Sequence, residues 1–195
     1  MSPRTASQLV EIRETSVNKI LDASLKLFAE QGYESTSISQ IAKKAGISKG
    51  LIYNYFDSKL DLLKGMIDRM NEGESQLMAM VMDDDPRKML KNIFKAFFSE
   101  IRDRTEVWKM IATITLQIDK FDFVHEMTVR KLNGFFDLFT DLLTQIGYPN
   151  PEQEAKLIGA LFDGIGFHYL IAMEEYPLDE LEEFLIKKYC KHELK

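Results

Sequence analysis

The residues best suited to chemistry lie at positions 48 to 54, where hydrogen-bond donors gather without an acidic neighbour. Lys49 carries a positive charge, Tyr53 a hydroxyl and Asn54 a carboxamide, and Gly50 lets another backbone approach closely. Such groups are suited to donate to phosphate oxygens and to base edges. The chemistry indicated is recognition of a nucleic acid.

Two short helices joined by a glycine turn are predicted to position these side chains. Ser37 and Gln40 have the spacing of a capping box, and apolar residues then recur at helical intervals. Gly46 is predicted to end this first helix, and Ser48 can cap the next. A helix, a tight turn and a second helix with exposed N-terminal residues is the helix-turn-helix geometry. The alternative is a small three-helix packing unit with a polar surface.

The run from Ile20 to Leu63 resembles the N-terminal domain of the TetR family of bacterial transcriptional regulators. The matching pieces are Leu27-Phe28, Gly32-Tyr33, Thr36-Ser37, Ile41-Ala42, Ala45 to Ser48, Ile52 to Phe56 and Ser58-Lys59. The resemblance covers roughly the first third of the chain. The remainder is similar to the family only in being helical, with an Asp-Gly pair at 163 and 164.

The resemblance implies a set of DNA contacts. Thr36 and Ser37 are expected to contact phosphate at the start of a helix. Lys59, further along the chain, is also expected to contact a backbone phosphate. The other implied contacts are Ser48, Lys49, Gly50, Tyr53, Asn54 and Tyr55. Leu51 departs from the family pattern, which commonly has a small polar residue there, and it would suit contact with a thymine methyl group.

Composition and charge are compatible with this expectation. The chain has 195 residues, of which 45% are hydrophobic and 29% charged, as is ordinary for a globular protein. Its net charge is -6, but residues 1–56 hold seven basic and five acidic side chains, or +2, which leaves -8 for the rest. A duplex is attracted by the local patch rather than by the total charge. The acidic part is therefore expected to face away from DNA.

The chain is expected to fold as an all-α protein of about nine helices. Residues 1–15 are polar and are predicted to form a flexible arm, although Arg4 and Arg13 could reach DNA. Residues 16–57 form the predicted three-helix DNA-binding domain, and residues 58–195 a helical ligand-binding and dimerisation domain. In the latter, apolar periodicity predicts helices over about 58–82, 86–101, 105–119, 122–146, 151–173 and 178–190.

The helix from Pro151 is apolar around most of its circumference, so it must bury more than one side. In the family, the last two long helices form a four-helix interface between subunits. A homodimer is therefore implied, with an interface predicted at Leu161, Ile165, Leu181 and Leu185. An intramolecular core helix is the alternative.

Thirteen Phe, ten Met and one Trp supply large, adaptable side chains that suit an apolar cavity. A regulatory cavity is also implied by the family. The predicted lining, chosen from inward faces, is Met70, Phe94, Trp108, Ile111, Thr113, Leu132, Phe136, Phe162 and His168. Plain core packing is the alternative at each position.

Other classes of function find little support in the sequence. The three histidines are too scattered for a zinc site, no catalytic motif is present, and neither a cofactor nor a metal is expected. The single cysteine excludes an intramolecular disulfide, and no signal peptide or membrane span is expected, so a cytoplasmic location follows.

The function expected is that of a homodimeric repressor, which binds double-stranded operator DNA and releases it when an apolar or amphipathic small molecule binds. The competing class is a helical ligand-binding or adaptor protein that does not use its helix-turn-helix.

Overall fold

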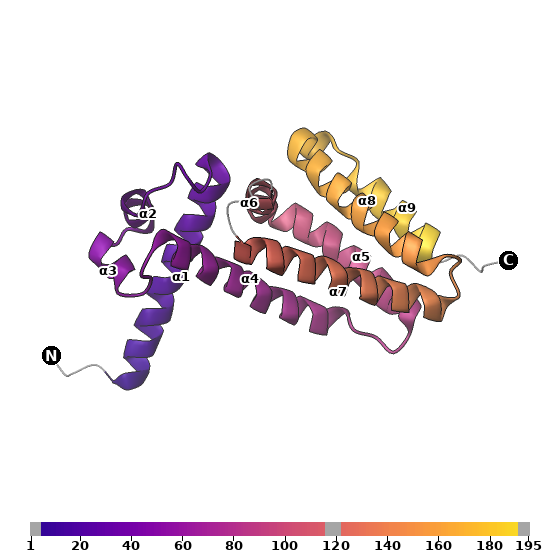
Figure 1. Ribbon diagram of the computed structural model, residues 1–195, viewed down its shortest axis with the longest axis horizontal. Coiled ribbons are helices and arrows are strands. Elements are labelled where there is room, and N and C mark those ends of the chain that lie inside the picture. Colours follow the sequence, from indigo (N-terminus) through magenta and orange to yellow (C-terminus); the bar gives the residue numbers. More distant parts are fainter. Residues whose placement is uncertain (1–4, 116–121, 191–195) are drawn as a thin grey trace. The chain divides into compact units, whose positions relative to one another are not determined.

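The computed structural model describes residues 5–115 and 122–190, and every regular element in these ranges is helical. Figure 1 shows the elements, and the all-α prediction is confirmed. They are α1 (Ala6–Gln31), α2 (Ile38–Ala45), α3 (Lys49–Tyr53), α4 (Lys59–Val81), α5 (Pro86–Asp103), α6 (Thr105–Thr115), α7 (Asp122–Ile146), α8 (Pro151–Ala172), the 3-10 turn η2 (Met173–Glu175) and α9 (Leu178–Cys190). The chain divides into two units, with the boundary inside α4 between Glu74 and Ser75.

The first unit is built around the second half of α1. Ile20 and Phe28 of α1, Ile41 of α2 and Ile52 of α3 are each at most 1% exposed, and Leu62 of α4 is fully buried with them. These apolar residues recur at three- and four-residue intervals, so each short helix buries one stripe and exposes the other. The small core fixes how α2 and α3 are presented.

The prediction of a flexible arm over residues 1–15 was wrong for its described part, which is helical from Ala6 on. Helix α1 begins at Ala6, and Thr5 and Gln8 form a capping box at its start, with Thr5 Oγ1 accepting from the Gln8 N–H at 3.3 Å. The cap satisfies the first free backbone donors and lets the polar stretch continue as helix. Residues 1–4 of the proposed arm, including Arg4, lie outside the described part of the chain.

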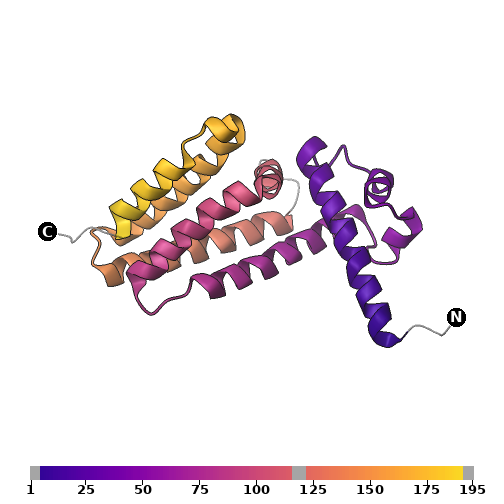
Figure 2. The ribbon, with the colours of Figure 1, turned by 180° about the vertical axis from the view of Figure 1, so that it is seen from behind.

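The second unit has an aromatic core. Phe94 of α5 is fully buried and packs against Phe139 of α7, Phe162 of α8 and Tyr189 of α9, with ring centroids 5.7 to 6.3 Å apart. Phe97 stacks on Phe162 at 3.7 Å. Helix α7 packs along α8 and α5 packs along α9, and Figure 2 shows α5 and α9 from the reverse side. The aromatic residues of the sequence therefore serve mainly to join these four helices.

A buried polar contact ties α8 to α9 in this core. The Tyr189 hydroxyl donates to Glu154 Oε2 at 2.9 Å. The pKa of Tyr189 is raised above its usual value, first by burial of the hydroxyl and second by the contact with Glu154. A buried hydroxyl keeps its place when it has such a partner.

The helix boundaries of the second unit follow the local sequence signals. Pro86 occupies the first turn of α5, where the sequence predicts a helix to begin, and Asp85 caps this helix by accepting from the Arg87 N–H at 2.9 Å. Helix α6 is described to Thr115, and residues 116–119 of the helix predicted there lie outside the described ranges.

Helix α8 and the turn after it, Pro151–Glu175, form the one described stretch that is long and apolar enough to cross a membrane by length and composition. One helix of this kind is weak evidence for a span, because core helices pass the same test. Only 28% of its most apolar window is buried, so much of its apolar surface is exposed within the unit.

The predicted dimer residues divide into two pairs. Ile165 and Leu185 are 5% and 4% exposed and belong to the core, so neither is available to a partner and that part of the prediction was wrong. Leu161 and Leu181 are only partly buried. Sequence periodicity cannot tell an inward stripe from an outward one when a helix is apolar on both.

Candidate nucleic-acid interface and apolar groove

Local caps shape the α2-turn-α3 region. Ser37 caps α2 with Gln40 as its capping-box partner, and the Gln40 N–H donates to Ser37 Oγ at 3.2 Å. Gly46 ends α2 at φ 68°, in the left-handed region that glycine adopts without strain. Ser48 Oγ accepts from the Leu51 N–H at 3.2 Å and starts α3. Three short-range signals thus set the angle at which α3 leaves the turn.

The outward face of α3 carries the donors singled out in the sequence. Lys49, Gly50, Tyr53 and Asn54 are all exposed, whereas Ile52 is fully buried. The Lys49 ammonium lies 5.8 Å from the centroid of the Tyr53 ring. The structure therefore brings a cation, a phenol and a carboxamide onto one exposed face.

The neighbouring predicted contacts are less open. Leu51 and Tyr55 are half-buried, while Ser37 and Ser48 are exposed but occupied as helix caps. The Arg13 guanidinium lies over the Tyr55 ring at 5.4 Å. Since Arg13 belongs to the helical start of α1, α1 adds a cation beside Tyr55.

Thr36 does not fit the predicted phosphate contact. It is 2% exposed, and its hydroxyl donates to the Gly32 carbonyl at 2.7 Å. The side chain closes the loop between α1 and α2 from inside, so phosphate cannot reach it. The match to the family motif gave its position in the sequence but not its direction.

Lys59 also differs from its predicted role. Its ammonium donates to the carbonyls of Tyr33, Glu34 and Thr36 at 2.8, 3.3 and 2.9 Å. An ammonium has three donors, and all three are used here. The predicted phosphate contact was therefore wrong, and Lys59 instead fixes the loop that leads into α2. Partners more than twenty residues away in sequence leave no local signal.

A groove of about 420 Å³ lies between α6 and α8 in the second unit. Its lining is mostly apolar and consists of Trp108, Ile111, Ala112, Asp163, Gly164, Gly166, Phe167 and Leu170. Trp108 and Ile111 are the two predicted lining residues found there. Sequence reasoning noted Asp163 only as part of the Asp-Gly pair and did not place Phe167 on an inward face, so it missed the α8 wall.

The other seven predicted lining residues lie elsewhere. Phe94 and Phe162 are core residues, Leu132 is 43% exposed on α7, and Met70 belongs to the first unit. Thr113 donates its hydroxyl to the Lys109 carbonyl at 2.8 Å. Phe136 is half-buried beside Phe135, and the exposed His168 pairs with the Tyr176 hydroxyl at 3.3 Å. The prediction of a cavity lined by this set was wrong.

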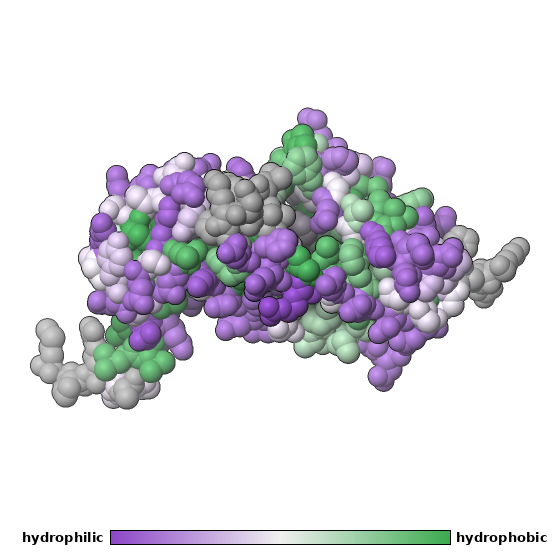
Figure 3. All heavy atoms as spheres, viewed as in Figure 1, coloured by the Kyte–Doolittle hydropathy of each residue, from purple (hydrophilic) through white to green (hydrophobic). Residues whose placement is uncertain are grey.

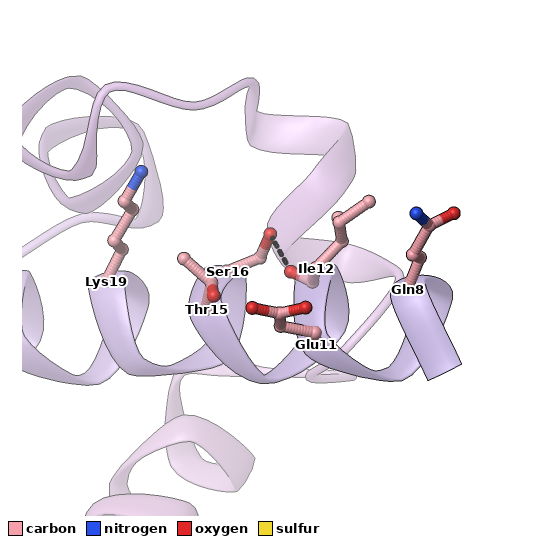
Figure 4. Close-up of a pocket in the computed structure, with 6 residues that line it drawn as sticks. All are labelled: Gln8, Glu11, Ile12, Thr15, Ser16 and Lys19. Atoms are coloured by element: carbon pink, nitrogen blue, oxygen red, sulfur yellow. Dashed lines mark hydrogen bonds between the residues drawn. The ribbon is translucent and has the colours of Figure 1, made fainter. Parts of the chain in front are cut away.

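A second hollow, of about 520 Å³, lies along the exposed part of α1. Figure 4 shows its six lining side chains, from Gln8 to Lys19, projecting from this single helix. Ser16 Oγ is already committed to the Ile12 carbonyl at 2.8 Å. With no opposing wall in the described part of the chain, this hollow does not enclose a ligand. Nor do the residues that the structure describes contain a group of three or more side chains able to hold a metal ion.

Comparison with known proteins gives a match to a protein family over part of the chain and matches to individual regulators. Residues 20–66 match the family described as bacterial regulatory proteins, tetR family. The HTH-type transcriptional regulator AcrR of Shigella flexneri is 32% identical over 136 residues, which are 66% of this chain and 58% of AcrR. The matched part thus spans less than two thirds of that relative. The regulator BetI of Yersinia pestis (strain Pestoides F) is 24% identical over 205 residues, covering 100% of this chain and 94% of BetI.

Among solved structures, a putative transcriptional regulator from Saccharomonospora viridis, in complex with choline, superposes with a TM-score of 0.77. It is 18% identical, and the match covers 91% of this chain and 96% of that one. At this identity the likeness shows the fold alone. The fold match includes both units, whereas the family match is confined to the first.

Proposed function

Because the chain belongs to the TetR family of bacterial regulatory proteins, we propose that it is a ligand-responsive transcriptional regulator that binds double-stranded operator DNA as a homodimer. The observation that carries the proposal is the exposed face of α3. Lys49, Tyr53 and Asn54 lie there together without an acid, and Gly50 leaves open space beside them. Helix α3 enters the major groove, where Tyr53 and Asn54 contact base edges and Lys49 a phosphate.

The other contacts surround this face. Ser37 and Ser48 stand at the starts of α2 and α3, where backbone N–H groups attract phosphate oxygens. Leu51 and Tyr55 offer apolar contact at the edge of the groove, and Arg13 adds a cation beside Tyr55. A DNA-binding domain that ends near residue 57 and a regulatory domain that follows remain part of the proposal.

Dimerisation uses the exposed apolar surface of α8 and α9. Leu157, Ile171 and Phe184 are 46%, 69% and 60% exposed, and Leu161 and Leu181 lie beside them, partly buried. Figure 3 shows apolar surface at the free end of α8. Apolar side chains gathered on one face favour burial against a second copy, and two copies can then engage inverted half-sites.

Ligand response is assigned to the second unit. A small apolar or amphipathic molecule binds there and shifts α4, which is continuous from Lys59 to Val81 and contains the unit boundary. The shift alters the spacing of the two α3 helices, and the repressor leaves its operator. Linkage requires that operator DNA weaken ligand affinity by the same factor. The protein acts in the cytoplasm, where the chromosome lies, and no catalysis is assigned to it.

The test is a mobility-shift assay against the promoter of the protein's own gene at low and moderate salt. The wild type is expected to bind specifically, and Lys49→Ala and Tyr53→Ala to weaken binding by about 1–3 kcal/mol each. An unchanged affinity in both variants would refute the assigned face. If the wild type binds no DNA, the alternative of a helical ligand-binding or adaptor protein takes its place.

A further inference from the structure

Among the described residues that line the groove between α6 and α8, one side chain is ionisable and the others are apolar. That side chain is the carboxylate of Asp163, which shares the lining with Trp108, Ile111 and Phe167. Within residues 5–115 and 122–190, Asp163 has no hydrogen-bond or ion-pair partner. Asp163 is exposed to solvent, yet partial burial beside the apolar walls raises the pKa of its carboxyl, because leaving water disfavours the charged form. A carboxylate in this setting is stabilised most by a cation that enters the groove.

Trp108 is held firmly in the wall beside it. A Cβ atom at Gly166 would lie 3.2 Å from Cε3 and Cζ3 of the indole, so glycine at this position lets the ring lie against the backbone of α8. The indole also meets Phe97 at right angles, with centroids 5.7 Å apart. These two contacts preorganise the aromatic surface, which lowers the ordering cost of binding.

Phe167 completes the aromatic part of the lining and is 54% exposed. On α8 the helical repeat turns Asp163, Gly166, Phe167 and Leu170 toward the groove. Leu157, Leu161 and Ile171 lie on the adjacent face proposed for dimerisation. Gly164, which also lines the groove, lies by the helical repeat between Leu157 and Ile171, so the groove borders the surface proposed for dimerisation.

We propose that this groove binds a small organic cation, such as an amine or a quaternary ammonium compound with an apolar body. The charged head is held by the Asp163 carboxylate and by the face of an aromatic ring, since aromatic quadrupoles attract cations in apolar surroundings. The apolar body fills the space beside Ile111 and Leu170. A cavity of about 420 Å³ is of the size that takes one small ligand.

Charge decides between the classes of ligand. An anion would meet Asp163 in the part of the chain, residues 57–195, whose net charge is -8, from -6 overall less +2 for residues 1–56. A neutral ligand would cover the carboxylate and leave it without a counter-charge. The assignment rests on the proposed function only in making this cation the effector, because cation binding itself needs no DNA.

The test uses Trp108, which is the single tryptophan of the chain and therefore reports on the groove by its own fluorescence. The full-length protein is titrated with phenyltrimethylammonium and, separately, with its neutral isostere tert-butylbenzene. We expect a saturable change in emission with the cation, and binding of the isostere weaker by about tenfold or more.

Asp163→Asn keeps the shape of the side chain and removes its charge, so affinity for the cation should fall by about tenfold. Asp141→Asn, at an exposed aspartate of α7 outside the groove, is the matched control and should bind as the wild type does. Equal affinity for the two probes in the wild type, or no saturable change with the cation, overturns the proposal even if a variant fails to fold. Equal affinity of Asp163→Asn and wild type for the cation overturns it as well.

Adding the cation to the protein-DNA complex in the mobility-shift assay tests whether the cation is the effector, separately from whether it binds the groove. Loss of the complex supports both proposals. If the cation binds with the expected charge preference but DNA binding never occurs, the groove assignment stands and the regulatory function falls.

Discussion

At the residue scale, two lysines of the same motif have opposite surroundings. Lys49 is exposed beside Tyr53, whereas Lys59 donates to three backbone carbonyls at 2.8 to 3.3 Å. The first is free to neutralise a phosphate, and the second is part of the scaffold. Their roles can therefore be separated by measuring stability and salt dependence on the same variants.

Lys49→Met should leave the unfolding free energy nearly unchanged and reduce the salt slope of DNA binding by about one for each α3 helix. Lys59→Met should destabilise the protein by about 2 kcal/mol, because it removes charge-assisted hydrogen bonds to the part-buried carbonyls of Tyr33 and Thr36 and to the exposed carbonyl of Glu34. Its salt slope should match that of the wild type. Denaturant unfolding and anisotropy titrations over a range of salt measure both quantities, and a reduced slope for Lys59→Met would return Lys59 to the phosphate contacts.

Cys190 provides a residue-scale test in the second unit. Burial raises the pKa of its thiol from 9.0 to about 11, although Lys91 and Arg87 nearby oppose the rise. Because only the thiolate reacts, a rise of this size lowers the reactive fraction near pH 8 by about 100-fold. Iodoacetamide should therefore label the native protein at least that much more slowly than the urea-unfolded chain, and the native rate should climb as the pH approaches 11. Equal rates in the two states would contradict the burial of α9 at this end.

At the element scale, the features that could be predicted from sequence are those with local causes. The Ser37 and Ser48 caps, the Gly46 stop and the helix start at residue 86 each depend on residues within one helical turn, and each is found where predicted. The direction of Thr36, the carbonyl partners of Lys59 and the α8 wall of the groove depend on packing between distant segments. Periodicity shows that a helix has an apolar stripe but not which neighbour covers it.

Alanine variants of two glycines in the helix-turn-helix distinguish the effect of backbone strain on stability from the effect of an added side chain on DNA binding. Gly46 has φ 68° with open space around its Cβ position, so Gly46→Ala should cost about 1 kcal/mol of stability through strain alone. Gly50 lies within α3, also in open space, so Gly50→Ala should preserve or slightly raise stability. Its added methyl group should nevertheless weaken DNA binding at the point of closest approach. Thermal unfolding and DNA titration of both variants test this, and full DNA affinity in Gly50→Ala would show that no backbone approaches there.

At the scale of the whole molecule, the exposed stripe on α8 and α9 predicts a dimer. Phe184→Glu and Ile171→Glu place a charge on side chains that are 60% and 69% exposed in one chain, and each should raise the dimer dissociation constant by about 30-fold or more. Val129→Glu, at a 43% exposed apolar position on α7, is the matched control and should leave the dimer intact. Sedimentation velocity across a concentration series measures the constant. If the control and the two variants behave alike, the dimer surface lies elsewhere.

Recognition of duplex DNA by paired α3 helices is tested by selecting bound sequences from a random duplex pool. Wild-type protein should enrich an inverted repeat whose half-sites lie about one helical turn or more apart, and a protein carrying Tyr53→Ala should lose this enrichment. Recovery of no preferred sequence, or of the same repeat with Tyr53→Ala, would contradict it.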